Sequence, residues 1–247
     1  MNKIRIGLNG AGGKMCLSIQ NLIENNQDFD LVAQINRQHT KSQIINDCNK
    51  CDTILDFSSA DGLNSLLECL DDSAVKILVG TTGLHDGQLD QLKNISKNRA
   101  VLYAPNTSLG PNLVAQMAAK AAQILKSYDI EILESHHRYK KDAPSGTALM
   151  IGQEIAKARE IDFKEYAVFN RNNSMRQDNE IGFASIRAGG IYGEHEVIFA
   201  NDYELVTIGT RALSRQSFAQ GALFAAKWLN NQPPGFYSMK DVLSNMM

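Results

Sequence analysis

Long hydrophobic runs are missing from this sequence of 247 residues. No stretch reaches the roughly 20 apolar residues that a membrane helix needs, and the most apolar helix candidate, Leu113 to Leu125, is interrupted by glutamine and lysine. Charge of one sign is also scarce, because the formal net charge is only -2. The sequence therefore argues against a membrane partner, and it offers no basic surface for a nucleic-acid partner.

Cysteine is rare, and the chain has four: Cys16, Cys48, Cys51 and Cys69. Cys48 and Cys51 form a lone C-x-x-C pair, a spacing found in zinc and redox sites. A zinc site needs four ligands, and no second pair lies at a matching spacing. The first residues alternate like a strand and do not resemble a secretory signal. We therefore expect reduced thiols, no metal site and a cytoplasmic location.

The first part of the chain alternates short strands with helices. Strands are predicted over 3–8, 29–35, 53–57, 76–79 and 101–104, and helices over 14–25, 60–70 and 86–97. This alternation indicates an α/β fold with helices on both faces of a parallel sheet. Rossmann-like, doubly wound sheets of this kind bind dinucleotides at the carboxyl ends of their strands.

Strands dominate after Pro105. Helices are predicted over 110–126 and 144–159, and strands over 130–134, 167–170, 180–187, 196–199 and 204–210. The pattern predicts an α+β second domain with an open mixed sheet. Helices over 215–230 and from residue 238 are expected to pack back on the first domain. We therefore predict a dinucleotide-binding domain of residues 1–106 with 216–247, and a substrate-binding domain of residues 107–215.

A glycine-rich turn connects the first strand to the first helix. Its residues are Gly10, Ala11, Gly12, Gly13, Lys14 and Met15. Glycine lets the backbone approach a pyrophosphate, and the free N–H groups of a helix N-terminus attract anions. Met15 takes the last position of the G-x-G-x-x-G spacing, so a plain strand–helix turn is the competing interpretation. We predict that the loop binds NADPH or NADH.

The second predicted strand ends without the acidic residue that usually binds the ribose hydroxyls. Asn36 and Arg37 stand there instead. Asn36 can hydrogen-bond a hydroxyl and Arg37 can pair with a 2′-phosphate, so we predict that NADPH is at least tolerated. Further cofactor contacts are predicted after two later strands of the same sheet, at Gly80, Thr81, Thr82, Ala104, Pro105, Asn106 and Thr107.

Acid/base groups gather in a single stretch of residues 134–148. His136 and His137 end a predicted strand, so their side chains are expected to point to opposite faces. Imidazole transfers protons near neutral pH. Lys140 can donate a proton or hold a carboxylate as a point charge.

The helix predicted to start at Pro144 adds an anion-binding end to this stretch. Gly146 allows close approach of the backbone, and Thr147 adds a hydroxyl donor. We predict that this end binds a substrate carboxylate, and that Asp142 caps the helix.

The segment Glu134–Leu149, ESHHRYKKDAPSGTAL, closely resembles the signature of the 4-hydroxy-tetrahydrodipicolinate reductase (dihydrodipicolinate reductase) family. The resemblance extends over nearly the whole chain, including residues 10–15, 80–82, 104–107 and 181–195. It implies NAD(P)H-dependent reduction of an unsaturated cyclic dicarboxylate on the route to diaminopimelate and lysine. It also implies a homotetramer assembled through the sheet of the second domain.

The resemblance further implies the roles of single residues. His136 would be a proton donor and acceptor and Lys140 a proton donor, while His137, Gly146 and Thr147 would bind substrate. The sequence departs from the family at two points. Cys16 stands where the family often has glycine, and the acid after the second strand is missing.

Two other hypotheses stay open. One is another two-domain NAD(P)-dependent dehydrogenase that acts on amino or semialdehyde substrates, and the other is a nucleotide-binding sensor without catalysis. Such a sensor could keep the glycine loop yet lose His136 or Lys140. Both residues are present, which favours the reductase.

Overall fold

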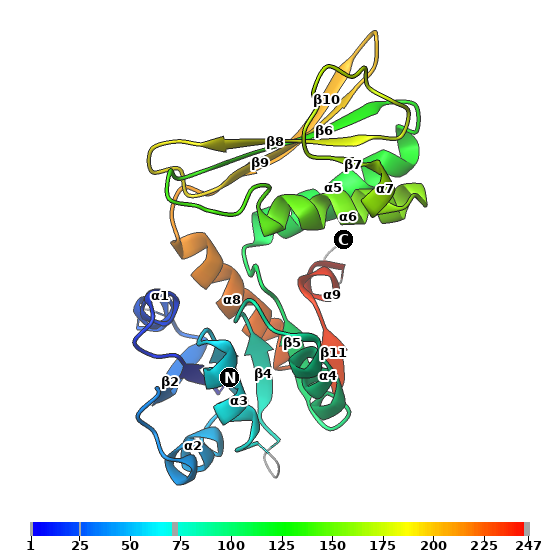
Figure 1. Cartoon of the computed structure of the whole chain (residues 1–247). Coiled ribbons are helices and arrows are strands. Elements are labelled where there is room, and N and C mark those ends of the chain that lie inside the picture. The colour runs from blue at the N-terminus through cyan, green and yellow to red at the C-terminus, as the bar shows by residue number, and fades with distance from the viewer. Residues whose placement is uncertain (1, 25, 71–73, 245–247) are drawn as a thin grey trace. The chain divides into compact units, whose positions relative to one another are not determined.

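A computed structural model describes residues 2–24, 26–70 and 74–244. The chain forms two compact units (Figure 1), one of residues 1–109 and 215–247 and the other of residues 110–214. The first unit contains a parallel six-stranded sheet and the second a mixed five-stranded sheet. The predicted fold class is therefore confirmed.

The sheet of the first unit has the strand order β11-β5-β4-β3-β1-β2, with every pairing parallel. Its strands are β1 (Ile4–Asn9), β2 (Phe29–Ile35), β3 (Thr53–Asp56), β4 (Lys76–Val79), β5 (Ala100–Tyr103) and β11 (Gly235–Tyr237). The chain adds β2 on one side of β1 and β3 on the other. The direction of winding reverses there, so the crevice beside the carboxyl end of β1 is the topological switch point.

Helices cover both faces of this sheet, each with its own hydrophobic core. One face packs against α1 (Lys14–Ile23), α8 (Gln216–Leu229) and α9 (Met239–Ser244). The other packs against α2 (Lys41–Cys48), α3 (Ala60–Leu67) and α4 (Asp86–Ile95). Successive strand residues divide between the two cores, as Ile54 and Leu55 do in β3, because side chains alternate across a strand.

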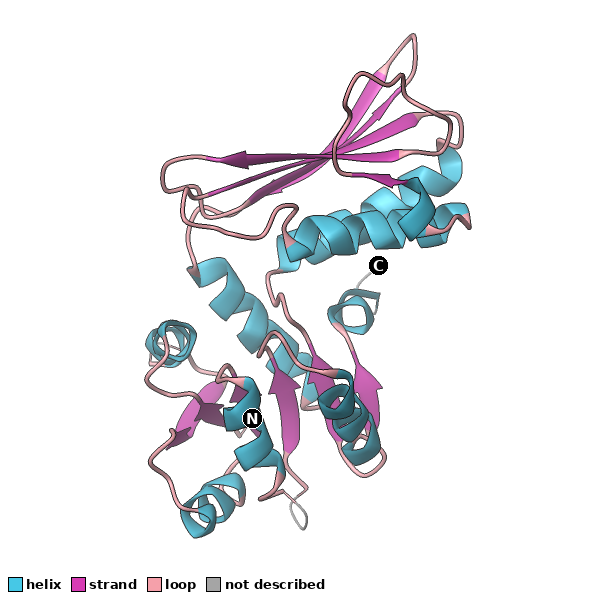
Figure 2. Cartoon of the chain, viewed as in Figure 1, coloured by secondary structure: helices cyan, strands magenta, loops and turns pink. Residues whose placement is uncertain are grey.

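The sheet of the second unit has the order β10-β9-β6-β8-β7. The unit comprises α5 (Leu109–Ile124), β6 (Asp129–His136), α6 (Gly146–Arg159), α7 (Phe163–Tyr166), β7 (Ala167–Val168), β8 (Ile181–Arg187), β9 (Glu194–Ala200) and β10 (Leu205–Arg211). Figure 2 shows α5 and α6 along one face of the sheet, where Ile132 and Phe199 are fully buried. Within residues 110–214, all of which the structure describes, no helix covers the opposite face.

Three elements were not predicted from the sequence, namely α2, α7 and β11. The start of α2 carries a capping box, in which Thr40 accepts from the backbone N–H of Gln43 and the Gln43 side chain accepts from that of Thr40. The T-x-x-Q spacing is a readable signal for such a start. Pro233 and Pro234 were interpreted only as the end of a helix, and the edge strand β11 follows them directly.

The prediction that Asp142 caps a helix was wrong. The helix α6 begins at Gly146, later than the predicted start at Pro144, and Ser145 is its N-cap. The Ser145 hydroxyl accepts a hydrogen bond of 3.2 Å from the N–H of Ala148. Asp142 instead forms an ion pair of 2.9 Å with Lys140.

Candidate active site

The four predicted cofactor segments follow β1, β2, β4 and β5 of the first sheet. Because these strands are parallel, their carboxyl ends lie at one edge of the sheet. The glycine loop, residues 10–13, lies at the end of β1, which is the switch point. The structure therefore brings the segments to the edge where dinucleotides bind in open α/β sheets.

The glycine loop has the geometry of an anion site. Gly10 has a φ of +87°, and a Cβ there would lie 2.6 Å from the carbonyl oxygen of Phe57, so only glycine fits. Gly13, the N-cap of α1, has no side-chain cap, and the first turn contains no acid. The N–H groups of that turn are thus available to a pyrophosphate. These residues fit the phosphates of a dinucleotide.

A buried carboxylate supports this edge and was not identified from the sequence. Asp56, at the end of β3, is fully buried and accepts hydrogen bonds from Asn9 Nδ2 at 2.7 Å, Ser58 Oγ at 2.5 Å and Thr81 Oγ1 at 2.6 Å. Burial raises the pKa of Asp56, and the three donors act in the opposite direction. The available signal was an aspartate that ends an otherwise apolar strand.

Two of the predicted cofactor residues use their hydroxyls within the fold. Thr81 donates to Asp56, and Thr107 Oγ1 donates to the carbonyl oxygen of Phe218 at 2.7 Å. Both side chains are buried, with exposed fractions of 4% and 2%. The hydroxyl protons of these two residues are therefore already used within the fold.

The acid/base segment is organised around Glu134 and His136, which lie on the same face of β6 because they are two residues apart. His136 Nδ1 lies 2.5 Å from Glu134 Oε2. Arg187, opposite His136 on β8, donates to both carboxylate oxygens of Glu134, at 2.6 and 2.9 Å. The backbone N–H of Ser145 donates to Glu134 as well, at 3.3 Å. Glu134 is only 1% exposed.

These contacts fix the protonation of the pair. Burial opposes the ionisation of Glu134, but hydrogen bonds led by that of Arg187 outweigh it and lower the pKa of Glu134 to about 2. Burial lowers the pKa of His136, and the adjacent Glu134 carboxylate offsets this in part. Glu134 thus stays ionised at neutral pH and accepts the proton of His136 Nδ1, which leaves Nε2 as the ring nitrogen that Glu134 does not contact.

Room for the His136 ring is provided by Gly193, just before β9. A Cβ at Gly193 would lie 3.1 Å from His136 Nε2, and its φ of +153° favours glycine. Any side chain at this position would cover the nitrogen that we expect to react.

A second histidine ties β9 to the start of α6. His195 Nε2 lies 2.9 Å from the Ser145 hydroxyl, and its ring packs edge-on against that of His136 with centroids 5.2 Å apart. Burial lowers the pKa of His195 to about 4, so it is neutral at pH 7. His195 and Ser145 together hold the end of α6 beside His136.

The remaining predicted residues follow β6 along the chain. His137 Nδ1 is buried and has no hydrogen-bond partner among the described residues. Lys140 is paired with Asp142. A Cβ at Gly146 would meet nothing within 4 Å, so the N-terminus of α6 is open to a ligand. Sequence reasoning gave no separate role to Glu134, Arg187, Ser145 or His195. Arg187 and His195 reach the site only through the pairing of β8 and β9 with β6.

All four cysteines are free and buried. Burial raises the pKa of Cys16, Cys48 and Cys51 to about 12, so these thiols stay protonated at neutral pH and are poor nucleophiles. In the part of the chain that the structure describes, no helix has both the length and the hydrophobicity to cross a membrane.

Comparisons with known proteins agree with this geometry. The N-terminal family model of dihydrodipicolinate reductase matches residues 4–107, and the C-terminal model matches residues 110–243. The chain is 40% identical over 244 residues to the 4-hydroxy-tetrahydrodipicolinate reductase of Rickettsia bellii, covering 99% of this chain and 96% of that relative. It is 41% identical over 249 residues to the reductase of the same name from Zymomonas mobilis, covering 98% of each.

A solved structure has the same fold. It is the dipicolinate-bound dihydrodipicolinate reductase from Paenisporosarcina sp. TG-14, with a TM-score of 0.80 at 24% identity over the whole of both chains. The dinucleotide-binding sheet and these relatives define the chain as an NAD(P)H-dependent oxidoreductase. Within that class, it belongs to the dihydrodipicolinate reductase family. The resemblance found in the sequence is thereby confirmed.

Proposed function

We propose that this chain reduces 4-hydroxy-tetrahydrodipicolinate to tetrahydrodipicolinate with NADPH or NADH, in the diaminopimelate route to lysine. The observation that carries the proposal is the buried Glu134–His136 pair beside the open N-terminus of α6. Such a pair handles protons, and such a helix end binds carboxylates. The chain is similar along nearly its full length to proteins named for this reaction, 4-hydroxy-tetrahydrodipicolinate reductases.

The first unit would bind the cofactor, which supplies the hydride. Residues 10–15 would receive the pyrophosphate at the start of α1, and Asn36 with Arg37 would contact the adenosine ribose. Residues 80–82 and 104–107 would line the edge farther along the sheet. The uncapped helix start, the absence of an acid in its first turn and the open space beside Gly12 support this assignment.

The second unit would handle the proton. Loss of the 4-hydroxyl group as water first leaves a conjugated ring. Hydride addition to that ring moves an electron pair toward the ring nitrogen, so a proton must be delivered there. Lys140, a cation held by Asp142, would donate this proton. His136 would exchange protons through Nε2, with its tautomer set by Glu134. A cationic donor near that nitrogen also stabilises the developing negative charge.

Gly146 and Thr147 would bind a substrate carboxylate at the first turn of α6, where backbone N–H groups lack helical partners. His137 would add a side-chain contact, and its buried, unpartnered Nδ1 supports this role. Ser145 and His195 would keep the helix end in place for that contact.

We also propose that the enzyme is a cytoplasmic homotetramer assembled through the sheet of the second unit. The face of that sheet without helices carries exposed apolar side chains, including Leu205 at 61% and Ile186 at 43%. Light scattering on the purified protein would give a mass four times 27.2 kDa for such an assembly. A monomer mass would contradict it.

The experiment for the activity follows the loss of NADPH or NADH absorbance. Because the substrate is unstable, it is made in the cuvette by the preceding synthase from pyruvate and aspartate semialdehyde. Loss of absorbance that requires both the synthase and this protein supports the reductase. Binding of NAD(P)H without any loss of absorbance would favour a nucleotide-binding sensor or a different dehydrogenase.

A further inference from the structure

A single buried side chain, that of Asp56, connects neighbouring strand ends at the carboxyl edge of the first sheet. Asn9 ends β1, Asp56 ends β3 and Thr81 follows β4, and these strands are adjacent in the sheet. Asp56 Oδ1 accepts from Asn9 Nδ2 at 2.7 Å, and Asp56 Oδ2 accepts from Thr81 Oγ1 at 2.6 Å. All three side chains are buried. The proposed reaction assigns no task to Asp56.

Backbone groups fix the direction of these hydrogen bonds. The N–H of Ser58 donates to Thr81 Oγ1 at 3.0 Å, so the Thr81 hydroxyl must turn its own proton toward Asp56. Asn9 Nδ2 lies 3.2 Å from the carbonyl oxygen of Gly62, which identifies it as the amide nitrogen. Asp56 must therefore accept at both of its oxygens. A carboxylate can do this, whereas an amide accepts at one end and donates at the other.

A dinucleotide lies along this edge in a defined direction. In sheets of this type the pyrophosphate lies at the turn after β1, and the adenosine ribose lies at the end of β2. In the strand order β4-β3-β1-β2, the nicotinamide half then extends over the ends of β3 and β4. That is the part of the edge that Asp56 connects.

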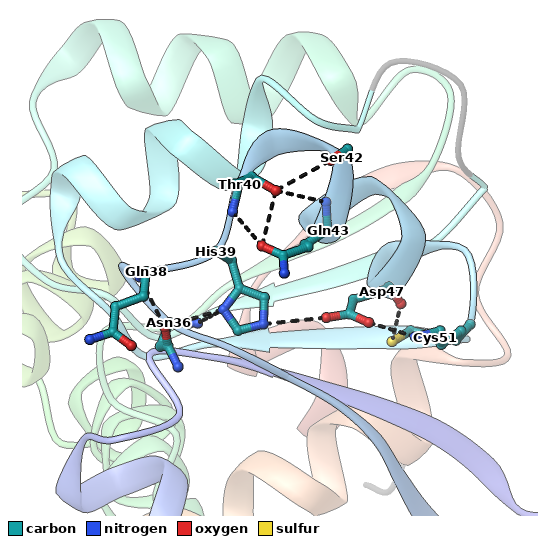
Figure 3. Close-up of polar contacts among 9 residues, drawn as sticks. Asn36, Gln38, His39, Thr40, Ser42, Gln43, Asp47 and Cys51 are labelled. Atoms are coloured by element: carbon teal, nitrogen blue, oxygen red, sulfur yellow. Dashed lines mark hydrogen bonds and ion pairs between the residues drawn. The ribbon is translucent and has the colours of Figure 1, made fainter.

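The loops that would receive the adenosine half and the pyrophosphate are held by other contacts. The backbone attaches the glycine loop to the end of β2, because the N–H groups of Gly10 and Ala11 both donate to the carbonyl oxygen of Ile35 at 3.0 Å. The segment after β2 is organised by contacts within itself (Figure 3), such as the N–H of Gln38, which donates to Asn36 Oδ1 at 2.9 Å. None of these contacts involves Asp56.

The segment of residues 80–82, on the nicotinamide side, is attached through Asp56. The N–H of Gly80 donates to the Asp56 carbonyl oxygen at 2.8 Å, and the Thr81 hydroxyl donates to the Asp56 side chain. A Cβ at Gly80 would overlap the ring of Phe57, so the segment also packs directly on the residue that follows Asp56. Without the Thr81 contact, the nucleotide would have to order the segment as it binds, which lowers its affinity.

We propose that Asp56 is a positioning residue for the nicotinamide half of the cofactor, and that it acts through Thr81 without touching the cofactor. The inference rests on the proposed function, because it takes the carboxyl edge of the first sheet as the nucleotide site. Asp56 places residues 80–82 relative to the glycine loop before the nucleotide arrives. The adenosine half binds independently of Asp56, because its loops are held by other contacts.

The test compares the binding of a whole dinucleotide with the binding of its adenosine half. Titration calorimetry on the full-length protein gives the dissociation constant of the dinucleotide that binds more tightly, NADPH or NADH. It also gives that of the matching half, 2′-phospho-ADP or ADP. Thr81→Val keeps the shape of the side chain and removes the hydroxyl, whereas Thr81→Ser keeps the hydroxyl.

Asp56→Asn breaks the same link from the other side. Asn9 and Ser58 both donate to Asp56 Oδ1, at 2.7 and 2.5 Å, so the amide oxygen of the variant is expected to face them. Its NH₂ group then faces Thr81 and cannot accept the hydroxyl proton.

Thr53→Val is the matched control. Thr53 is, like Thr81, a buried threonine, and it begins β3, the strand that Asp56 ends. Its hydroxyl has no hydrogen-bond partner among the described residues. The substitution there removes a buried hydroxyl without breaking a contact, so both affinities should stay native. Thermal melts establish that each variant is folded.

Thr81→Val and Asp56→Asn should each weaken dinucleotide binding by about threefold to tenfold, the scale of one hydrogen bond. Their effects should not add in the double variant, because both remove the same contact. Affinity for the adenosine half should stay native in every variant, and Thr81→Ser should bind the dinucleotide as the native protein does.

An equal loss of affinity for both ligands would show a merely structural role and overturn the inference. Native affinity for the dinucleotide in folded Thr81→Val would overturn it as well. If the native protein bound neither ligand, the proposed function would fail, and the inference with it.

Discussion

At the scale of single residues, the acid/base site depends on a buried carboxylate, that of Glu134. Glu134 is held ionised by Arg187 and orients His136 through a contact of 2.5 Å. Removing one partner of a buried ion pair leaves the other charge unpaired. This costs more stability than the intact pair contributes. The geometry therefore makes Glu134 a positioning residue for His136.

Glu134→Gln should lower kcat by about 100-fold, because acid/base catalysis contributes a factor of at least about this size. The carboxylate raises the pKa of His136, so its loss should move the pH–rate limb that belongs to His136 to lower pH. The control is Glu131→Gln, because Glu131 lies on the same strand, pairs with Arg176 and points to the opposite face. A pH profile that stays in place would show that Glu134 has only a structural role.

His195 makes stability depend on pH. Its folded-state pKa of about 4 lies below the ordinary value of 6.5, so the unfolded chain binds more protons between these values. Stability should therefore fall as the pH falls through this window, by about 2 kcal/mol for this residue at pH 5. Urea unfolding at pH 7 and pH 5 measures the loss, which His195→Gln should reduce. An equal loss in both proteins would mean that other groups cause it.

At the scale of elements, the turn between β1 and α1 contains two glycines in different surroundings, one without space for a side chain and one with space for it. Gly10 fits only as glycine, whereas a Cβ at Gly12 would meet nothing within 4 Å. A larger side chain at Gly12 should therefore be accepted by the folded protein and excluded by a bound pyrophosphate.

Gly12→Val should abolish NAD(P)H binding while the thermal midpoint stays close to native. Gly10→Ala should lower the midpoint, because it adds a clash with Phe57 and strain at positive φ of the order of 1 kcal/mol or more. Nucleotide titration and thermal melts on both variants provide the comparison. Native affinity in Gly12→Val would show that the loop is not the pyrophosphate site.

The sequence predicted the elements with strong periodicity and the residues that are close together along the chain. The glycine loop and the His136–Lys140 segment are local motifs, so their residue types suffice to find them. Arg187 and His195 enter the site only through the register of β8 and β9 with β6, which no local pattern encodes. The short helix α2 was missed because its hydrophobic pattern is weak, although its capping box was readable.

At the scale of the whole molecule, the first unit is built from both ends of the chain. The helices α8 and α9 supply buried residues to one face of the first sheet, among them Ala222, Leu229 and Val242. The strand β11 extends the edge of the same sheet beside β5. The nucleotide-binding edge therefore depends on residues that follow the second unit.

A chain that ends at residue 214 should lose nucleotide binding and the cooperative unfolding of the first unit, because one face of its sheet would be exposed. Calorimetric unfolding together with NAD(P)H titration checks this. Adding residues 215–247 as a separate peptide should restore part of the binding. Full affinity in the shortened chain would contradict the division into units.

We propose that Lys140 delivers a proton during nucleotide-dependent reduction, and the Lys140→Met variant tests this role directly. The steady-state rate with NADPH is measured beside the dissociation constant of NADPH, with Lys157→Met, at the far end of α6, as the control. We expect kcat to fall by at least about 100-fold in Lys140→Met, while NADPH affinity stays native and the control is fully active. Near-native turnover in folded Lys140→Met would show that Lys140 does not deliver the proton.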